Sequence, residues 1–291
     1  MKEIVVLSGK GGTGKTSIAG CFAALAKDKV LADCDVDAAD LHLLLKPEAV
    51  RKEEFWSGQS AYIDDKICTG CGLCQELCRF GAIRNLKVDP ASCEGCGFCY
   101  RVCPVGAITM KYNMAGHWFI CDTRYGPLVH ARLGIAQENS GKLVALVRQQ
   151  AKKLAEEARF TVIITDGPPG IGCPVISSLS GADLALLVTE PTLSGVHDLE
   201  RVIGVCRHFN VPPVVCVNKY DINEEKAVEI EHYCTENGIN LAGQIPFDTS
   251  VNQAVTQGVP LVEYNDGPAS RAVRMVWNNL EGMLSANKTV E

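Results

Sequence analysis

The sequence predicts an α/β fold in which a mainly parallel sheet is covered by helices on both faces, with a small α+β domain inserted into it. Short, continuous apolar runs alternate with segments of helical spacing, and this alternation is typical of buried parallel strands. A glycine-rich loop joins the first apolar run to the first helical segment. A doubled run of cysteines then interrupts the alternation, which indicates a separate module within the chain.

Five apolar runs are expected to form strands of the sheet. Each run is short, mostly apolar and separated from the next by segments of helical spacing, as a strand buried on both faces should be. The expected strands are Glu3–Ser8, Val30–Cys34, Phe160–Thr165, Leu184–Thr189 and Val214–Val217.

Three helices are expected from composition and periodicity. The segment from about Lys15 to Lys27 is rich in alanine. Gly141–Arg159 carries leucine and valine at helical spacing, with Asn139 or Ser140 as its N-cap. The segment of about Ser270–Leu284 has its apolar residues on one face, which predicts a helix packed on the sheet.

Composition excludes several classes of protein. The 291 residues are 47% apolar and 21% charged, which describes a globular protein able to bury a large core. The formal net charge of −6 argues against general nucleic-acid binding. The first apolar run, Ile4–Leu7, ends in a loop of glycine and lysine, so we interpret it as a buried strand and not as a signal peptide. No apolar run is long enough to cross a bilayer, and we expect a cytoplasmic protein without a membrane partner.

The chain has fifteen cysteines, and eight of them lie between Cys68 and Cys103. A secreted disulfide scaffold would be short and rich in loops, so this clustering in a long chain indicates metal in a reducing cytoplasm. The spacing of the first four cysteines recurs in the second four, displaced by 25 residues: Cys68, Cys71, Cys74 and Cys78 correspond to Cys93, Cys96, Cys99 and Cys103. The repeat defines an insert at residues 61–111, within a host domain formed by residues 1–60 and 112–291.

Residues 9–16 read Gly-Lys-Gly-Gly-Thr-Gly-Lys-Thr and fit the phosphate-loop pattern of a P-loop NTPase. The loop lies between a strand and a helix, where backbone N–H groups and the helix N-terminus can surround phosphate oxygens. Lys15 is expected to reach the β- and γ-phosphates, and the Thr16 hydroxyl is expected to bind Mg²⁺. The expected nucleotide-binding residues of this segment are Gly9, Lys10, Gly11, Gly12, Thr13, Gly14, Lys15, Thr16 and Ser17.

Lys10 is an additional lysine that an ordinary phosphate loop does not require. With it, the loop resembles the deviant Walker A ATPases, a family that includes MinD, ParA, the Mrp-type iron–sulfur ATPases and the nitrogenase iron protein. The resemblance implies that ATP and Mg²⁺ are bound and that the active form is a homodimer. It also implies that Lys10 reaches the phosphates of the partner subunit.

Two acidic segments resemble further motifs of this family. Leu31-Ala-Asp-Cys-Asp resembles the second acidic motif, which implies that Asp35 positions or activates the attacking water and that Asp33 lies near Mg²⁺. Ile163-Ile-Thr-Asp-Gly-Pro-Pro-Gly resembles the Walker B strand, which implies that Asp166 holds Mg²⁺. The implied catalytic residues are Lys10, Lys15 and Asp35.

Two later segments resemble the family's base-binding loops. Asn218 corresponds to the adenine-reading turn, where an amide can both donate to and accept from the base. Pro246 and Asp248 correspond to a late loop that contacts the purine.

Two positions after Asp166 bear on a comparison with the nitrogenase iron protein. That protein has a carboxylate where this chain has Gly170, so the catalytic role falls on Asp35, as in MinD. It has a cluster-ligand cysteine at the position of Cys173, which makes Cys173 a candidate additional thiol site. The alternative is that Cys173 is a small buried or switch-lining cysteine.

Each cysteine run has the spacing C-x-x-C-x-x-C-x-x-x-C, in which three thiolates from one tight loop can bind one 4Fe-4S cluster. The insert resembles bacterial two-cluster ferredoxins, although the first run ends in Cys78-Arg79 where the second has Cys103-Pro104. The resemblance implies that the fourth cysteine of each run binds the other cluster. The implied ligands are Cys68, Cys71, Cys74 and Cys103 for cluster one, and Cys78, Cys93, Cys96 and Cys99 for cluster two. Zinc sites, and clusters that only fold the insert, are the alternatives.

The chain as a whole resembles MinD-superfamily ATPases with an inserted ferredoxin domain, some of which are labelled cobyrinic acid a,c-diamide synthase-like. The resemblance implies an iron–sulfur ATPase, slow without a partner, that couples nucleotide state and dimerisation to electron transfer or metallocluster handling. Its partner would be a redox or cofactor-assembly protein. One alternative is a scaffold or carrier for iron–sulfur clusters or metal cofactors. Another is a positioning ATPase of the ParA or MinD type, against which the net charge of −6 counts.

Overall fold

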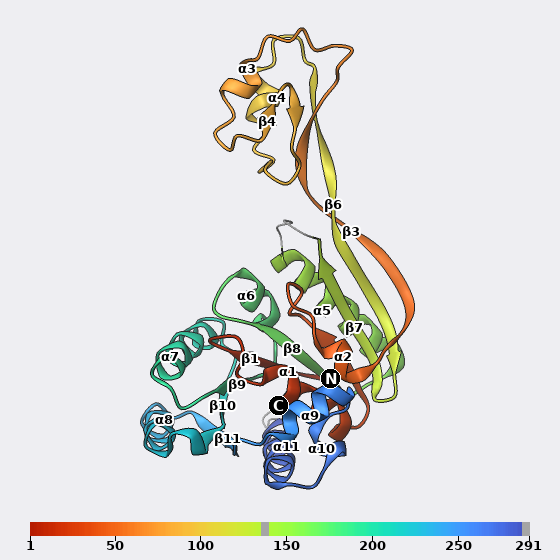
Figure 1. Cartoon of the computed structure of the whole chain (residues 1–291). Helices are drawn as coiled ribbons and strands as arrows, with labels where there is room; N and C mark the ends of the chain where they lie inside the picture. The colour runs from red at the N-terminus through yellow and green to blue at the C-terminus, as the bar shows by residue number, and fades with distance from the viewer. Residues whose placement is uncertain (135–139, 287–291) are drawn as a thin grey trace. The chain divides into compact units, whose positions relative to one another are not determined.

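The computed structural model describes residues 1–134 and 140–286 (Figure 1). The chain divides into two compact units. The first unit comprises Met1–Lys52, Trp118–Arg132 and the chain from Ser140 onward, and the second is formed mainly by Glu53–His117. The second unit is therefore longer at both ends than the cysteine repeat from which the insert was inferred.

A nine-stranded sheet has the strand order β11-β10-β9-β1-β8-β2-β7-β6-β3. The seven strands from β11 to β7 pair in parallel. These are β1 (Lys2–Ser8), β2 (Lys29–Asp33), β7 (Gly126–Leu133), β8 (Val162–Pro169), β9 (Leu184–Thr189), β10 (Pro213–Asn218) and β11 (Asn240–Ile245). Because most of them are short apolar runs covered by helices, the predicted α/β fold with a mainly parallel sheet is confirmed.

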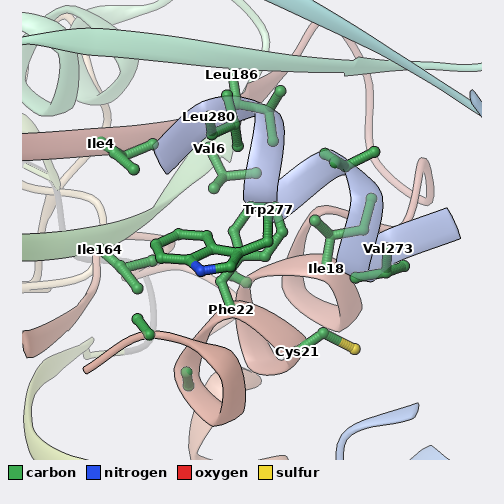
Figure 2. Close-up of a cluster of buried hydrophobic side chains, with 14 of the residues drawn as sticks. Ile4, Val6, Ile18, Cys21, Phe22, Ile164, Leu186, Val273, Trp277 and Leu280 are labelled. Atoms are coloured by element: carbon green, nitrogen blue, oxygen red, sulfur yellow. The ribbon is translucent and has the colours of Figure 1, made fainter. Parts of the chain in front are cut away.

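Helices cover both faces of the sheet in the first unit. Ile4 and Val6 of β1 face a core shared with α1 and α11, whereas Val5 and Leu7 face α6, α7 and α8. Figure 2 shows the first of these cores, in which the ring centroids of Phe22 and Trp277 lie 5.1 Å apart. The helices of this unit are α1 (Lys15–Leu25), α2 (Leu41–Leu45), α5 (Ser140–Ala158), α6 (Cys173–Leu179), α7 (Leu193–His208), α8 (Glu224–Glu236), α9 (Ser250–Gln257), α10 (Leu261–Tyr264) and α11 (Pro268–Ala286).

Two long strands, β3 (Glu48–Ile63) and β6 (Ile108–Thr123), carry the chain between the units and were not expected from the sequence. They are neighbours at one edge of the sheet. The first seven residues of β3 are exposed and several are charged, so no apolar run marks the strand. A turn at Arg124 and Tyr125 joins β6 to β7, which makes these two strands an antiparallel hairpin.

The second unit contains two short helices, α3 (Leu73–Glu76) and α4 (Phe98–Val102), one from each cysteine run. It also contains a small antiparallel hairpin of β4 (Ile83–Arg84) and β5 (Lys87–Val88). Its core is small and includes cysteine side chains among a few apolar residues, namely Ala61, Ile63, Cys74, Ile83 and Ile108. A core of this size leaves room for stabilisation by bound metal.

Several element boundaries differ from the expected ones by a few residues. Arg159 has a φ of +60°, so the chain turns there and β8 begins at Val162 and not at Phe160. Helix α5 begins at Ser140, and the alternative N-cap Asn139 lies outside the described residues. Within residues 1–134 and 140–286, none of the helices is long and apolar enough to cross a membrane.

Candidate functional site

The phosphate-loop sequence forms the connection between β1 and α1. Gly12 and Gly14 have φ values of +79° and +92°, which side chains rarely adopt. A Cβ at Gly14 would also lie 2.5 Å from Nδ2 of Asn218. That amide donates a 2.8 Å hydrogen bond to the carbonyl oxygen of Thr13. Asn218, predicted to contact adenine, therefore lies against the phosphate loop at the end of β10.

A pocket of about 890 Å³ lies beside this loop in the first unit. Ten of the predicted nucleotide-site residues line it: Gly11, Gly12, Gly14, Lys15, Thr16, Ser17, Asp35, Asn218, Pro246 and Asp248. Their elements are distant in the chain, but the parallel sheet brings the carboxyl ends of its strands to one edge. The pocket also includes apolar side chains that the sequence did not single out, among them Phe247, Val251 and Leu261.

Asp166 is a buried carboxylate beside the pocket. It lies in register with Asp33 on the neighbouring strand β2, and its side chain is only 1% exposed. Neither of its carboxylate oxygens has a hydrogen-bond partner among the described residues. Burial raises its pKa to about 6, although the charge of Lys15 favours the ionised form. Buried, unpartnered carboxylate oxygens are ligands that suit Mg²⁺, so this site fits the ion.

Asp33 and Asp35 differ from Asp166 in their contacts. Asp33 Oδ1 accepts the Asp35 N–H at 3.2 Å, and Oδ2 accepts the Leu41 N–H at 3.1 Å. Burial and the neighbouring Asp166 raise the pKa of Asp33 well above its ordinary value. Burial also raises the pKa of Asp35, against the effect of Lys15. Asp33 thus holds both ends of residues 35–41, while Asp35 faces the pocket.

Lys10 does not line the pocket of its own chain. Its ammonium lies 3.3 Å from a carboxylate oxygen of Glu190 and donates to the hydroxyls of Thr192 and Ser194 at 3.2 and 3.3 Å. Glu190 also binds Lys219 at 2.5 Å. Glu190 was not among the site residues expected from the sequence, although its place directly after the buried strand β9 indicates a position at the edge of the sheet where the site lies.

The cysteines of the second unit line two separate pockets. One pocket is lined by Cys68, Cys71, Cys74 and Cys103. The other, with a volume of about 220 Å³, is lined by Cys74, Cys78, Cys93, Cys96 and Cys99. Apart from the shared Cys74, the cysteines divide as the predicted ligand sets do, and the fourth cysteine of each run lies with the other run.

The backbone of the second unit repeats with the cysteines. Gly70 and Gly72 have φ values of +74° and +76°, and their counterparts Gly95 and Gly97 have +62° and +73°. A Cβ at Gly95 would lie 2.1 Å from the carbonyl oxygen of Gln59, so only glycine allows this approach. Each tight loop therefore needs glycine between its first cysteines to turn three thiols toward one pocket.

The donor set suits thiolate ligation. Cys103 Sγ accepts the Ala107 N–H at 3.3 Å. Burial tends to raise the pKa of Cys103, but backbone N–H groups outweigh this effect and the pKa is lowered. Within the described part of the chain, no three Cys, His, Asp or Glu side chains are gathered for a single metal ion. The thiolates of a 4Fe-4S cluster each bind a different iron, so a wider spacing fits that group.

The remaining cysteines lie outside these pockets. Cys173 is exposed at the start of α6, so it is not the buried residue that one interpretation expected. The Sγ atom of Cys121 lies 3.5 Å from Nε2 of His130. Four others are buried in the two cores of the first unit: Cys21, Cys206, Cys216 and Cys234.

The chain is similar to known proteins over most of its length. The CobQ/CobB/MinD/ParA nucleotide binding domain matches residues 4–261. An uncharacterised protein of Methanocaldococcus jannaschii is 34% identical over 283 residues, which is 96% of each chain. The iron–sulfur cluster carrier protein of Pyrococcus abyssi is 27% identical over 161 residues, or 50% of this chain and 54% of the carrier. Among solved structures, the septum site-determining protein MinD of Pyrococcus horikoshii, complexed with Mg-ADP, has a TM-score of 0.62 at 18% identity, covering 99% of each chain.

Proposed function

Because the chain belongs to the CobQ/CobB/MinD/ParA nucleotide-binding family, we propose that it couples its nucleotide state to two 4Fe-4S clusters held by the second unit. Membership makes it an ATPase of the MinD/ParA class, which uses ATP and Mg²⁺. The observation that carries the proposal is the division of eight cysteines between two pockets in the crossed arrangement of a two-cluster ferredoxin.

We assign the nucleotide chemistry to five side chains in and beside the pocket of the first unit. Lys15 and the loop N–H groups would neutralise phosphate oxygens. Thr16 and Asp166 would hold Mg²⁺, since the Asp166 oxygens are buried and have no partner within the described residues. Asp35 would orient the attacking water, because its half-buried carboxylate lines the pocket. Asp33 would position Asp35 through the N–H group that it accepts.

A homodimer would complete the active site. Lys10 contacts Glu190 within its own chain and does not line its own pocket. An ammonium at the surface of the phosphate loop can therefore serve a second copy of the chain if it leaves Glu190. This arrangement supports the trans role of Lys10, with closure of the dimer dependent on ATP.

The second unit would hold one cluster with Cys68, Cys71, Cys74 and Cys103, and the other with Cys78, Cys93, Cys96 and Cys99. When bound, the clusters would supply one-electron redox chemistry. The chain's own contribution is to present the thiolates from loops that glycine turns inward. Backbone N–H groups, such as that of Ala107, favour the ionised thiol.

Paired cysteine variants test the crossed ligand sets. We expect wild-type protein purified without oxygen to hold about eight irons per chain and little zinc. Cys68→Ser with Cys103→Ser removes two ligands of one cluster, so about four irons should remain. Cys68→Ser with Cys78→Ser removes one ligand from each cluster and should lower iron far more. The opposite ranking would mean that each run binds its own cluster, and zinc in place of iron would reject the proposal.

Cluster delivery is a second candidate function. It is favoured by the similarity of half the chain to an iron–sulfur cluster carrier protein. A carrier would transfer iron to an apo-ferredoxin acceptor in the presence of MgATP, whereas an electron-transfer protein would retain its iron under the same conditions. Iron measured in both proteins after separation distinguishes the two.

A further inference from the structure

Residues 34–40 connect the nucleotide pocket to helix α2. Four residues of this segment line the pocket, namely Asp35, Asp37, Ala38 and Asp40. One carboxylate, that of Asp33, accepts the N–H groups of Asp35 and Leu41, which flank most of the segment. A displacement of the segment by a γ-phosphate would therefore reach α2, whose first residue is Leu41.

Three aromatic rings continue from α2 into the sheet. The ring of His42 stacks on that of His130 in β7, with centroids 5.8 Å apart and planes 5° from parallel. The ring of His130 also stacks on that of Phe119 in β6, with centroids 4.7 Å apart and planes 12° from parallel. His130 also lies in register with Asp33 on β2. The stack thus begins beside the carboxylate that holds residues 35–41.

The stack lies in the first unit, near the start of β3 and the end of β6. Phe119 belongs to β6, and β3 starts at Glu48, shortly after α2 ends. These two strands are the segments that carry the chain to the cysteine unit. A change in α2 that moved the rings would therefore act directly on β6.

Packing alone is a poor explanation for two imidazoles at this position. His130 is buried, and its Nδ1 atom has no hydrogen-bond partner among the described residues. A buried polar atom without a partner is unfavourable, so apolar side chains would fill the space at lower cost. Arg132 holds His42 through Nε2 at 2.6 Å, and Cys121 approaches Nε2 of His130 at 3.5 Å. These contacts orient the rings rather than merely fill space.

We infer that the ring stack of His42, His130 and Phe119 couples the nucleotide pocket to β6, with the two histidines as positioning residues. The inference rests on the proposed function, because it names the route by which nucleotide state reaches the cysteine unit. Stacked rings transmit displacement because aromatic contacts are close-packed and directional.

Hydrogen exchange of the full-length holoprotein measures this coupling without relying on iron. We expect exchange of peptides covering residues 113–123 to differ by at least about fivefold between MgADP and a non-hydrolysable ATP analogue with Mg²⁺. His42→Ala should reduce that difference to less than about twofold while a fluorescent ATP analogue still binds within about threefold of wild type. His42→Phe keeps a ring at this position and should restore most of the difference.

A matched control is His208→Ala, because His208 contacts the Phe209 ring at 5.0 Å elsewhere in the first unit. We expect it to leave the exchange difference unchanged. The inference is overturned if wild-type β6 exchanges equally in both nucleotide states, or if His42→Ala keeps the full difference. Loss of the exchange difference in both His42→Ala and His42→Phe would also overturn it, because a ring at this position would then not suffice for coupling. Iron content is measured separately, so failure of the cluster proposal would be recognised independently.

Discussion

Replacing Asp166 by asparagine should stabilise the nucleotide-free protein at neutral pH, although it removes a residue proposed to bind Mg²⁺. The Asp166 side chain is 1% exposed, and its carboxylate oxygens have no hydrogen-bond partner within the described residues. Burial raises its pKa from 3.8 to about 6, in spite of the nearby charge of Lys15. Above pH 6 the fold must therefore hold an ionised carboxylate that water would solvate better.

The size of the effect follows from the pKa. The rise in the pKa of Asp166 from 3.8 to about 6 corresponds to a free energy of about 3 kcal/mol, at about 1.4 kcal/mol for each pKa unit. Folding raises the pKa of this carboxyl group, so its contribution to stability is fully present when the pH lies below its pKa in the unfolded state. The contribution is lost as the pH rises through its pKa in the folded state. Asparagine has nearly the same shape without the charge. We therefore expect Asp166→Asn to gain up to about 3 kcal/mol at pH 7.5 and nothing near pH 4.

Urea unfolding without nucleotide, in EDTA, at several pH values between 4 and 8 measures this difference. The free energy of unfolding of Asp166→Asn minus that of wild type should rise as the pH increases from about 4 through 6, and removing the charge of Asp166 should also ease the ionisation of Asp33. The exposed Asp122, replaced by asparagine, provides a control that should change the free energy of unfolding by less than about 0.5 kcal/mol. A variant no more stable than wild type at pH 7.5 would refute the reasoning. The same variant should lose Mg²⁺-dependent ATP hydrolysis.

Two further predictions concern charged side chains of the first unit. Lys10→Ala should keep the affinity for MgADP within about threefold of wild type, because the Lys10 ammonium lies outside the pocket of its own chain. The same variant should lose ATP-dependent dimerisation, measured by sedimentation. A dimer fraction equal to that of wild type would contradict this. Arg148→Met should lower the free energy of unfolding by up to about 3–5 kcal/mol in urea, because it removes the 2.7 Å partner of the buried Glu3 and leaves Lys152, at 3.2 Å, as its cation. The exposed Lys153→Met control should cost less than about 1 kcal/mol, and equal effects would argue against a buried ion pair.

The fold and the candidate sites could be predicted from the sequence where they depend on short local patterns of residues. The phosphate loop, the apolar strands and the cysteine spacing each follow from local rules, because glycine conformation and side-chain period act over a few residues. The structure places Lys15, Asp35 and Asn218 at one pocket, and the phosphate-loop motif and the family resemblance had implied a shared nucleotide site for them.

The features that the sequence did not reveal depend on contacts between distant segments. The strands β3 and β6 have no regular apolar pattern in their exposed stretches, so pairing and not composition defines them. The pairing of Glu190 with Lys10 could not be predicted, because the two residues are 180 positions apart in the chain and only the fold brings them together. The stacking of His42 on His130 has no signal in the sequence, since 88 residues separate the two rings.

We propose that nucleotide in the first unit alters the clusters held by the second. Anaerobic EPR of the dithionite-reduced protein tests this proposal, recorded without nucleotide, with MgADP and with MgATP, alongside iron and zinc analysis. We expect about eight irons per chain and a spectrum that changes with MgATP. Zinc in place of iron, or an iron spectrum identical in all three states, would contradict it.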